Sequence, residues 1–287
     1  MVNDIISFKE LSKNYKVIFF DSFGVLKNAD GMISGAQETF KNLLHSGIDY
    51  FILTNDASRS LEQLSQNFKE IGFQKKIPPE KIISSGIMAY EFLKQKINDG
   101  RVVYVGTEQS AIYIKSLGLD AVSIEDIDFE ERYLNTIKAL VFLDDEGFDW
   151  RIGINNCVNL LRKINVPVIV ANTDTIYPTH DNNISVAIGG IADFVESVLG
   201  RHFIKFGKPD IQIFNYAFQH INMGEEIYRK SDILMVGDTL TTDIMGANKF
   251  GIDTALVLSG NTIKSKAETT IKSLGIAPDY ICDSIGS

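Results

Sequence analysis

The chain has 287 residues and a formal net charge of −9 at pH 7, with 28 Lys and Arg against 37 Asp and Glu. This acidic balance disfavours nucleic acid and anionic membrane surfaces as partners, and two cysteines are too few for a disulfide scaffold. Residues 1–5 do not resemble a signal peptide and no apolar run reaches about 20 residues, so we expect a cytoplasmic enzyme or binding protein. At about 150 residues per domain, the length predicts two domains.

Short apolar runs alternate with helix-period segments from the start of the chain. Residues 17–20 are β-branched and aromatic, as in a buried strand, and residues 36–44 carry apolar side chains at helical spacing. Residues 50–53 form the next apolar run, and residues 61–71 the next helical stripe. Two buried strands joined by a helix predict a parallel βαβ unit.

The same alternation continues to the C-terminus. Further strands are predicted at residues 102–105, 139–143, 168–171, 233–236, 254–258 and 280–282. Further helices are predicted at residues 109–117 and 152–164, and before Gly251. The pattern predicts an α/β fold with a doubly wound parallel sheet.

Four polar segments follow or flank these strands, where ligands bind in open parallel sheets. They are Asp21-Ser22-Phe23-Gly24, Thr54-Asn55-Asp56, Gly207-Lys208-Pro209, and Gly237-Asp238 with Asp243 five residues later. Each segment alone has a simple structural interpretation, because Asp, Asn and Thr after a strand are common turn and helix-capping residues.

Together and in this order, the four segments resemble the signature motifs of the haloacid dehalogenase (HAD) superfamily. Residues 257–262, and residues 171–174 followed by Pro178-Thr179, resemble its NagD-type, p-nitrophenylphosphatase-like subgroup. The resemblance implies a HAD core of residues 1–82 and 185–287, with an inserted α/β cap domain at residues 83–184. Such caps exclude water and select the leaving group, and they often form homodimers, so the resemblance also suggests a homodimer.

The resemblance assigns roles to the motif residues. It implies a phosphohydrolase in which Asp21 attacks a phosphoryl group to form an aspartyl-phosphate, while Lys208 neutralises nucleophile and phosphate. Ser22, Thr54, Asn55 and Lys208 would bind the phosphate. The cofactor would be Mg²⁺, which prefers oxygen ligands. Its expected ligands are Asp21, the backbone carbonyl of Phe23, Asp238 and Asp243.

The substrate implied by the resemblance is a small phosphorylated metabolite, with sugar phosphates as the favoured class. The non-phosphate part of this substrate would contact the cap. We expect its lining at residues 144–150 and 172–183, with Asp145 and Asp174 as the substrate-binding candidates.

Phe23 departs from the family pattern. Family members carry there an Asp that protonates the leaving oxygen and then activates water, and loss of such a group typically costs about 10²–10⁴ in rate. The protein could therefore be a slow phosphatase, or one for substrates with acidic leaving groups. Alternatively, another group replaces the acid, with Asp144, Asp145 and His180 as candidates. The remaining alternatives are a phosphate-binding or regulatory protein with little turnover, and a phosphotransferase.

Overall fold

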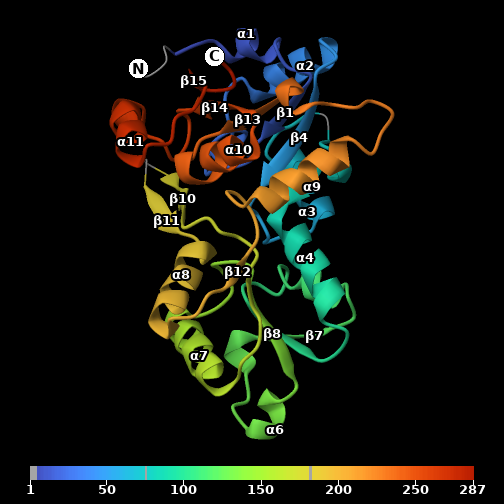
Figure 1. Cartoon of the computed structure of the whole chain (residues 1–287), viewed down its shortest axis with the longest axis vertical. Helices are drawn as coiled ribbons and strands as arrows, with labels where there is room; N and C mark the ends of the chain where they lie inside the picture. The colour runs from blue at the N-terminus through green and yellow to red at the C-terminus, as the bar shows by residue number, and fades with distance from the viewer. Residues whose placement is uncertain (1–4, 75, 181–182) are drawn as a thin grey trace.

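The computed structural model describes residues 5–74, 76–180 and 183–287. Residues 1–4, on which most of the signal-peptide prediction rests, lie outside that range. Two lobes lie one above the other, each built around its own parallel sheet (Figure 1). Among the described residues, no helix has the length and apolar character needed to cross a membrane.

The upper lobe, here called the core, contains a six-stranded parallel sheet in the order β15-β14-β13-β1-β4-β5. Its strands are β1 (Val17–Phe20), β4 (Asp49–Thr54), β5 (Ile82–Ser84), β13 (Ile233–Gly237), β14 (Asp253–Val257) and β15 (Tyr280–Cys282). Its helices are α1 (Phe8–Ser12), α2 (Ala36–His45), α3 (Leu61–Glu70), α9 (Ile211–Ile221), α10 (Met245–Phe250) and α11 (Ala267–Leu274).

Both faces of the core sheet are covered, as the continuous apolar runs predict. Successive side chains of a strand point to opposite faces, so β1 serves two layers. Ile18 and Phe20 pack in the cluster that contains α1, α2 and α3. Val17 and Phe19 pack against α9 and α10. The predicted doubly wound α/β fold is confirmed.

The lower lobe, here called the cap, contains a five-stranded parallel sheet in the order β12-β9-β8-β6-β7. Its strands are β6 (Arg101–Val105), β7 (Asp120–Ser123), β8 (Ile137–Phe142), β9 (Val168–Val170) and β12 (Ile204–Lys205). Its helices are α4 (Ser85–Lys96), α5 (Ile112–Lys115), α6 (Glu131–Leu134), α7 (Trp150–Lys163) and α8 (Ile188–Leu199). Helices α7 and α8 cover one face of this sheet, and α4 and α5 the other.

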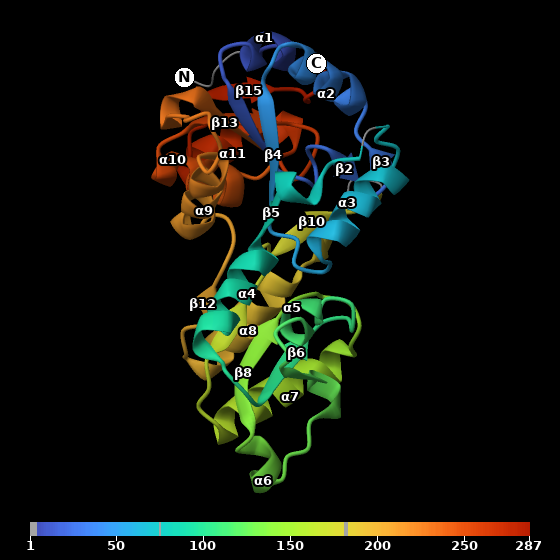
Figure 2. The same ribbon diagram turned by 90° about the vertical axis from the view of Figure 1, so that its right-hand side faces the viewer.

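The chain passes from the core strand β5 into α4 of the cap, and returns after β12 (Figure 2). The expected return to the core was residue 185. In the structure, α8 contributes Ile188, Ile191 and Val195 to the cap cluster, and β12 pairs with β9. We therefore propose a division in which the cap spans residues 85–206.

The helix predicted at residues 109–117 is limited to α5, which has four residues. Thr107 Oγ1 accepts a hydrogen bond from Ser110 N, and Ser110 Oγ donates to Thr107 O. Such local side-chain bonds stabilise a turn in place of the first helical residues.

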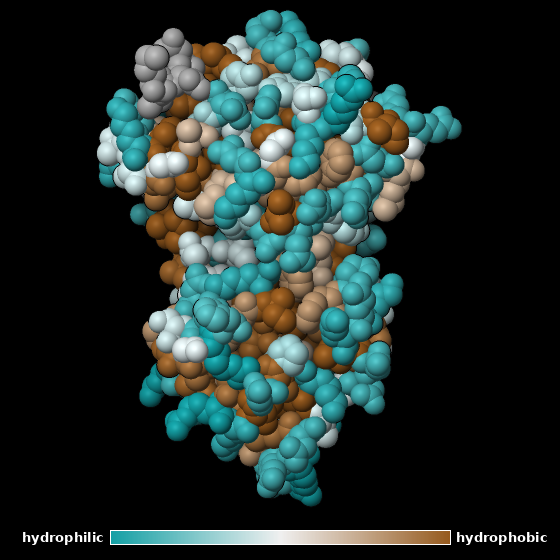
Figure 3. Space-filling view, in the orientation of Figure 1, coloured by the Kyte–Doolittle hydropathy of each residue, from teal (hydrophilic) through white to brown (hydrophobic). Residues whose placement is uncertain are grey.

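Figure 3 shows hydrophilic and hydrophobic residues interspersed over one face of both lobes.

Two short antiparallel hairpins complete the fold. One follows β1 in the core and pairs β2 (Lys27–Asn28) with β3 (Gly31–Met32). The other belongs to the cap segment and pairs β10 (Ile176–Pro178) with β11 (Ile184–Val186). Neither hairpin was predicted, because strands of two or three residues are too short for an apolar alternation to stand out.

Candidate active site

Parallel pairing brings the polar motif residues to one edge of the core sheet. Strand β1 lies between β13 and β4, and all three run in the same direction. Asp21 directly follows β1, Asp238 directly follows β13, and Thr54 ends β4. This is the carboxyl edge, where the motif segments were expected to meet.

Lys208 joins the first and last motifs. Its Nζ donates to Asp21 Oδ1 at 2.5 Å and to Asp243 Oδ1 at 2.7 Å, and only 2% of the side chain is exposed. Burial by itself lowers the pKa of Lys208, but Asp21 and Asp243 hold it above its usual value. Lys208 therefore stays an ammonium, shared between two carboxylates.

Three buried carboxylates form a group that could hold a metal ion. One carboxylate oxygen from each of Asp21, Asp238 and Asp243 lies within 4.8 Å of the others. Burial raises the pKa of Asp21 well above its usual range, with repulsion from Asp243 and Asp238 adding to it, against attraction by Lys208. Burial and Asp243 also raise the pKa of Asp238 to about 7.

These residues fit a hard divalent cation such as Mg²⁺. Lys208 carries one positive charge against three carboxylates, so the group is short of positive charge when all three are ionised. The buried Asn261 Oδ1 is a further oxygen near Asp238, since Asn261 N donates to Asp238 Oδ2 at 2.6 Å. Within the described residues this Oδ1 has no hydrogen-bond partner. Carboxylate and amide oxygens are ligands that such cations accept.

Two glycines allow the backbone to approach Asp238 closely. Gly24 has a φ of +81°, and a Cβ there would lie 2.1 Å from Asp238 Oδ2. A Cβ on Gly260 would lie 1.9 Å from the same oxygen. Any other residue at either position would push Asp238 out of place, so the motif glycines have a steric reason.

Asn55 is committed to protein contacts. Its Oδ1 accepts from Lys208 N at 2.7 Å, and its Nδ2 lies 3.0 Å from Lys208 O and 2.9 Å from Asp174 Oδ1. The side chain thus holds the Lys208 loop and the cap segment together. The other expected phosphate-binding residues, Ser22 and Thr54, line the cavity above Asp21.

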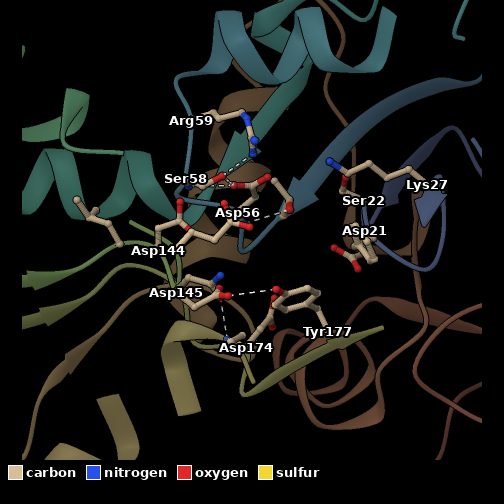
Figure 4. A pocket seen from close by; sticks show the side chains of 16 residues that line it. Asp21, Ser22, Lys27, Asp56, Ser58, Arg59, Asp144, Asp145, Asp174 and Tyr177 are labelled. Atoms are coloured by element: carbon tan, nitrogen blue, oxygen red, sulfur yellow. Dashed lines mark hydrogen bonds between the residues drawn. The ribbon is translucent and has the colours of Figure 1, made fainter. Parts of the chain in front are cut away.

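That cavity has a volume of about 260 Å³ and lies between the two lobes (Figure 4). The core contributes Asp21, Ser22, Phe23, Lys27, Thr54, Asp56, Ser58 and Arg59, and the cap contributes Leu143, Asp144, Asp145, Glu146, Asn172, Asp174, Tyr177 and Ala187. A second cavity of about 260 Å³ shares Asp21, Phe23, Asp174 and Tyr177 with the first, and it includes Asp238 and Asn261. Asp21 is therefore reached from two sides.

Asp145 and Asp174, the cap residues expected at the substrate, both line the main cavity. Burial raises the pKa of Asp145, whose Oδ2 accepts from Tyr177 Oη at 3.1 Å. Burial also raises the pKa of Asp174 to about 6, and burial with repulsion from Asp145 raises that of Asp144 to about 6.

His180, one candidate substitute for the missing acid, is not among the residues that line this cavity. It is exposed, and its Nδ1 lies 2.7 Å from Asp30 Oδ1. Phe23 itself meets Tyr177 of the cap in an edge-to-face contact with the ring centroids 6.2 Å apart. The ring at position 23 is therefore part of the contact between core and cap.

Two cations and one aromatic residue of the cavity were not predicted from the sequence: Lys27, Arg59 and Tyr177. Tyr177 falls inside the segment 172–183 that was expected to line the cap side. Lys27 follows the first polar segment, which ends at Gly24, and Arg59 follows the second, which ends at Asp56. Inspection of the residues directly after each segment could have found both cations. Burial lowers the pKa of Lys27, against attraction by Asp56.

Comparison with known proteins agrees with this geometry. Residues 18–120 match the family model of haloacid dehalogenase-like hydrolases, and residues 205–287 match a second model, described as HAD-hydrolase-like. A crystal structure from Cytophaga hutchinsonii, described as a possible sugar phosphatase of the HAD superfamily, is 50% identical. It covers 99% of both chains with a TM-score of 0.93.

Two more distant relatives span almost the whole chain. Mouse chronophin is 26% identical over 93% of this chain and 90% of its own length. Glycerol phosphate phosphatase from Mycobacterium tuberculosis, solved in complex with magnesium, is 24% identical and shares the fold, with a TM-score of 0.74 over 98% of this chain and 78% of its own. The chain belongs to the haloacid dehalogenase superfamily, in its NagD-type, p-nitrophenylphosphatase-like subgroup with an α/β cap.

Proposed function

We propose that this protein is a Mg²⁺-dependent phosphohydrolase that acts on a small phosphorylated metabolite through an aspartyl-phosphate on Asp21. One observation carries the proposal: the buried Lys208 bonds both Asp21 and Asp243 beneath a cavity formed by core and cap. A sugar phosphate is the favoured substrate class. The possible sugar phosphatase at 50% identity supports that choice.

In the proposed reaction, an Asp21 carboxylate oxygen attacks the phosphorus as the bond to the leaving oxygen breaks. A water molecule then attacks the phosphorus and releases phosphate, which regenerates the Asp21 carboxylate. Lys208 holds the attacking carboxylate in place and offsets its charge. Asp21, Asp238, Asp243 and the Phe23 carbonyl would hold Mg²⁺, which when bound supplies the positive charge that a phosphoryl group requires among these carboxylates.

Phe23 favours a second candidate function. Its ring cannot accept a proton from the attacking water, so the aspartyl-phosphate would persist longer than in relatives with an acid there. A persistent intermediate suits transfer to an acceptor other than water. In that case the protein would be a phosphotransferase, or a phosphate-binding protein with little turnover.

The test is Asp21→Asn, assayed with Mg²⁺ on p-nitrophenyl phosphate, acetyl phosphate and a panel of sugar phosphates. The side chains are nearly isosteric, and Asn Oδ1 can still accept from Lys208. We expect turnover to fall to background while the melting curve keeps its single transition. Asp126→Asn, at an exposed cap residue outside the cavity, is the matched control.

Full turnover by Asp21→Asn would show that the assigned nucleophile is wrong. If the parent binds phosphate but turns over none of these esters, the phosphohydrolase proposal fails and the binding function takes its place. Faster consumption of acetyl phosphate when an alcohol is added, with the phosphate recovered on that alcohol, would identify a phosphotransferase.

A further inference from the structure

Lys27 lies beside the position of the missing acid. After Asp21 the chain turns sharply: Leu26 N and Lys27 N both donate to Ser22 O, at 2.9 and 3.1 Å, and Gly24 N donates to Lys27 O at 2.7 Å. This turn returns Lys27 to Phe23, and its Nζ lies 5.8 Å from the centroid of the Phe23 ring. In Figure 4 the amino group points into the cavity, on the side of Ser22 and Asp21.

The charge of Lys27 faces two aromatic rings rather than a carboxylate. Across the described ranges, no carboxylate forms an ion pair with it, whereas Lys208 has two such partners. Its side-chain hydrogen bond to Asn67 Oδ1 is long at 3.3 Å. An ammonium group has three donors, so Lys27 can donate to a ligand oxygen without losing a partner. The Nζ lies 5.8 Å from the centroid of the Phe23 ring and 5.6 Å from that of the Phe68 ring, and both rings attract a cation.

The position of Lys27 selects the leaving oxygen as its target. Lys208 already serves Asp21 from the floor of the cavity, on the nucleophile side. In an in-line displacement the leaving oxygen lies opposite the attacking oxygen, here toward the cavity and the cap. Lys27 lines that cavity, on the side of Ser22 and Asp21. Lys27 is the cation that the turn places next to position 23.

We propose that Lys27 is a catalytic residue that stabilises the leaving oxygen, in place of the acid that related enzymes carry at position 23. The proposal rests on the proposed phosphohydrolase function. As Asp21 forms its bond to phosphorus, the bond from phosphorus to the leaving oxygen breaks and its electron pair stays on that oxygen. Lys27 donates a hydrogen bond to the resulting charge. The departing group takes its proton from water, and Lys27 remains an ammonium.

The test is Lys27→Met, which removes the ammonium group and keeps a linear side chain. We would measure kcat/KM for acetyl phosphate, p-nitrophenyl phosphate, phenyl phosphate and alkyl or sugar phosphates. Loss of a donor at a developing oxyanion typically costs about 10²–10³ in rate. We expect that loss for the alkyl esters, and a fall of less than about fivefold for the activated esters, whose leaving groups need little stabilisation.

Two further variants make the result specific. Lys27→Arg retains the charge and should recover about tenfold or more of the loss on alkyl esters. Lys41→Met, at an exposed lysine of the core outside the main cavity, should leave every rate within about twofold, as surface substitutions usually do. Melting curves of all variants show whether Lys27→Met keeps the fold.

Several results would overturn the proposal. An equal fall for every ester would place Lys27 at the transferred phosphoryl group, and no fall would remove it from the reaction. Equal rates for Lys27→Arg and Lys27→Met would show that charge is not its contribution. Failure of this proposal is distinct from failure of the phosphohydrolase function, because Asp21→Asn tests the latter on acetyl phosphate, where Lys27 contributes little.

Discussion

The acidic residues on the core side of the cavity (the floor: Asp21 and Asp243) and those on the cap side (the wall: Asp144, Asp145 and Glu146) differ in how their charge is compensated. On the floor, Lys208 lies between Asp21 and Asp243 and forms ion pairs with both. On the wall, Asp144, Asp145 and Glu146 have no ion-pair partner in the described part of the chain. The hydroxyls of Thr107 and Tyr177 donate to Asp144 and Asp145. The charge of the floor is largely compensated by Lys208, whereas the wall offers acceptors that the hydroxyl groups of a substrate could use.

Removal of the shared cation would break the floor and should have the largest effect. Lys208→Met leaves Asp21 and Asp243 buried without their common partner, and breaking a buried ion pair in this way costs about 3–5 kcal/mol. We expect that loss in urea unfolding at pH 7.5, together with loss of turnover. Lys272→Met, which removes an exposed pair with Glu268, is the control and should cost less than about 1 kcal/mol. Equal losses of unfolding free energy for the two variants would show that the buried Lys208 ion pairs contribute no more than an exposed pair.

A substitution on the wall should change kcat/KM for some substrates and leave the rate on a substrate without hydroxyl groups unchanged. Asp145→Asn removes a charged acceptor, and a hydrogen bond to a charged group is worth about 1.5–3 kcal/mol, or roughly 10–100-fold. We expect a loss of that size in kcat/KM for sugar phosphates, and little change for acetyl phosphate, which has no hydroxyl groups. An equal loss of kcat/KM on both substrates would show that Asp145 contributes to the reaction at the phosphoryl group and not to recognition of the sugar hydroxyl groups.

The uncompensated charge of the wall should also appear in the pH dependence of stability. The pKa of Asp144 is raised from 3.8 to about 6, so its ionised form costs stability above pH 6 and the cost disappears below about pH 4. Asp144→Asn removes that cost. After allowance for partial exposure, we expect a gain of about 1 kcal/mol at pH 7.5 that shrinks as the pH falls through 6 toward 4. A gain independent of pH in urea unfolding would attribute the effect to packing.

The features that could be predicted from the sequence are local motifs and elements with a clear apolar spacing. The resemblance to the HAD motifs implied that Asp21, Asp238 and Asp243 share one site, and the three carboxylates lie within 4.8 Å of one another. The strand β1 and helix α2 were found by their apolar spacing. Here the local pattern and the global fold agree, and such agreement makes a prediction reliable.

Sequence reasoning performed less well where position depends on packing between distant segments. The insertion was expected to end at residue 184, whereas α8 and β12 pack with the cap sheet. Core and cap both alternate helices with strands, so the sequence pattern does not mark the boundary between them. Lys27 was missed since its role depends on a turn that no apolar period reveals. The side-chain contacts of Asn55 with Lys208 and Asp174 join residues more than a hundred positions apart, which a single sequence does not disclose.

Those contacts of Asn55 have a consequence for how the two lobes communicate. The Asn55 carboxamide bonds the main chain of Lys208 and also the side chain of Asp174 in the cap. A shift of the cap segment would therefore pull on the same side chain that fixes the backbone bearing Lys208. Binding or release of a ligand at the cap would change how rigidly Asn55 holds the backbone of Lys208, the cation that bonds Asp21.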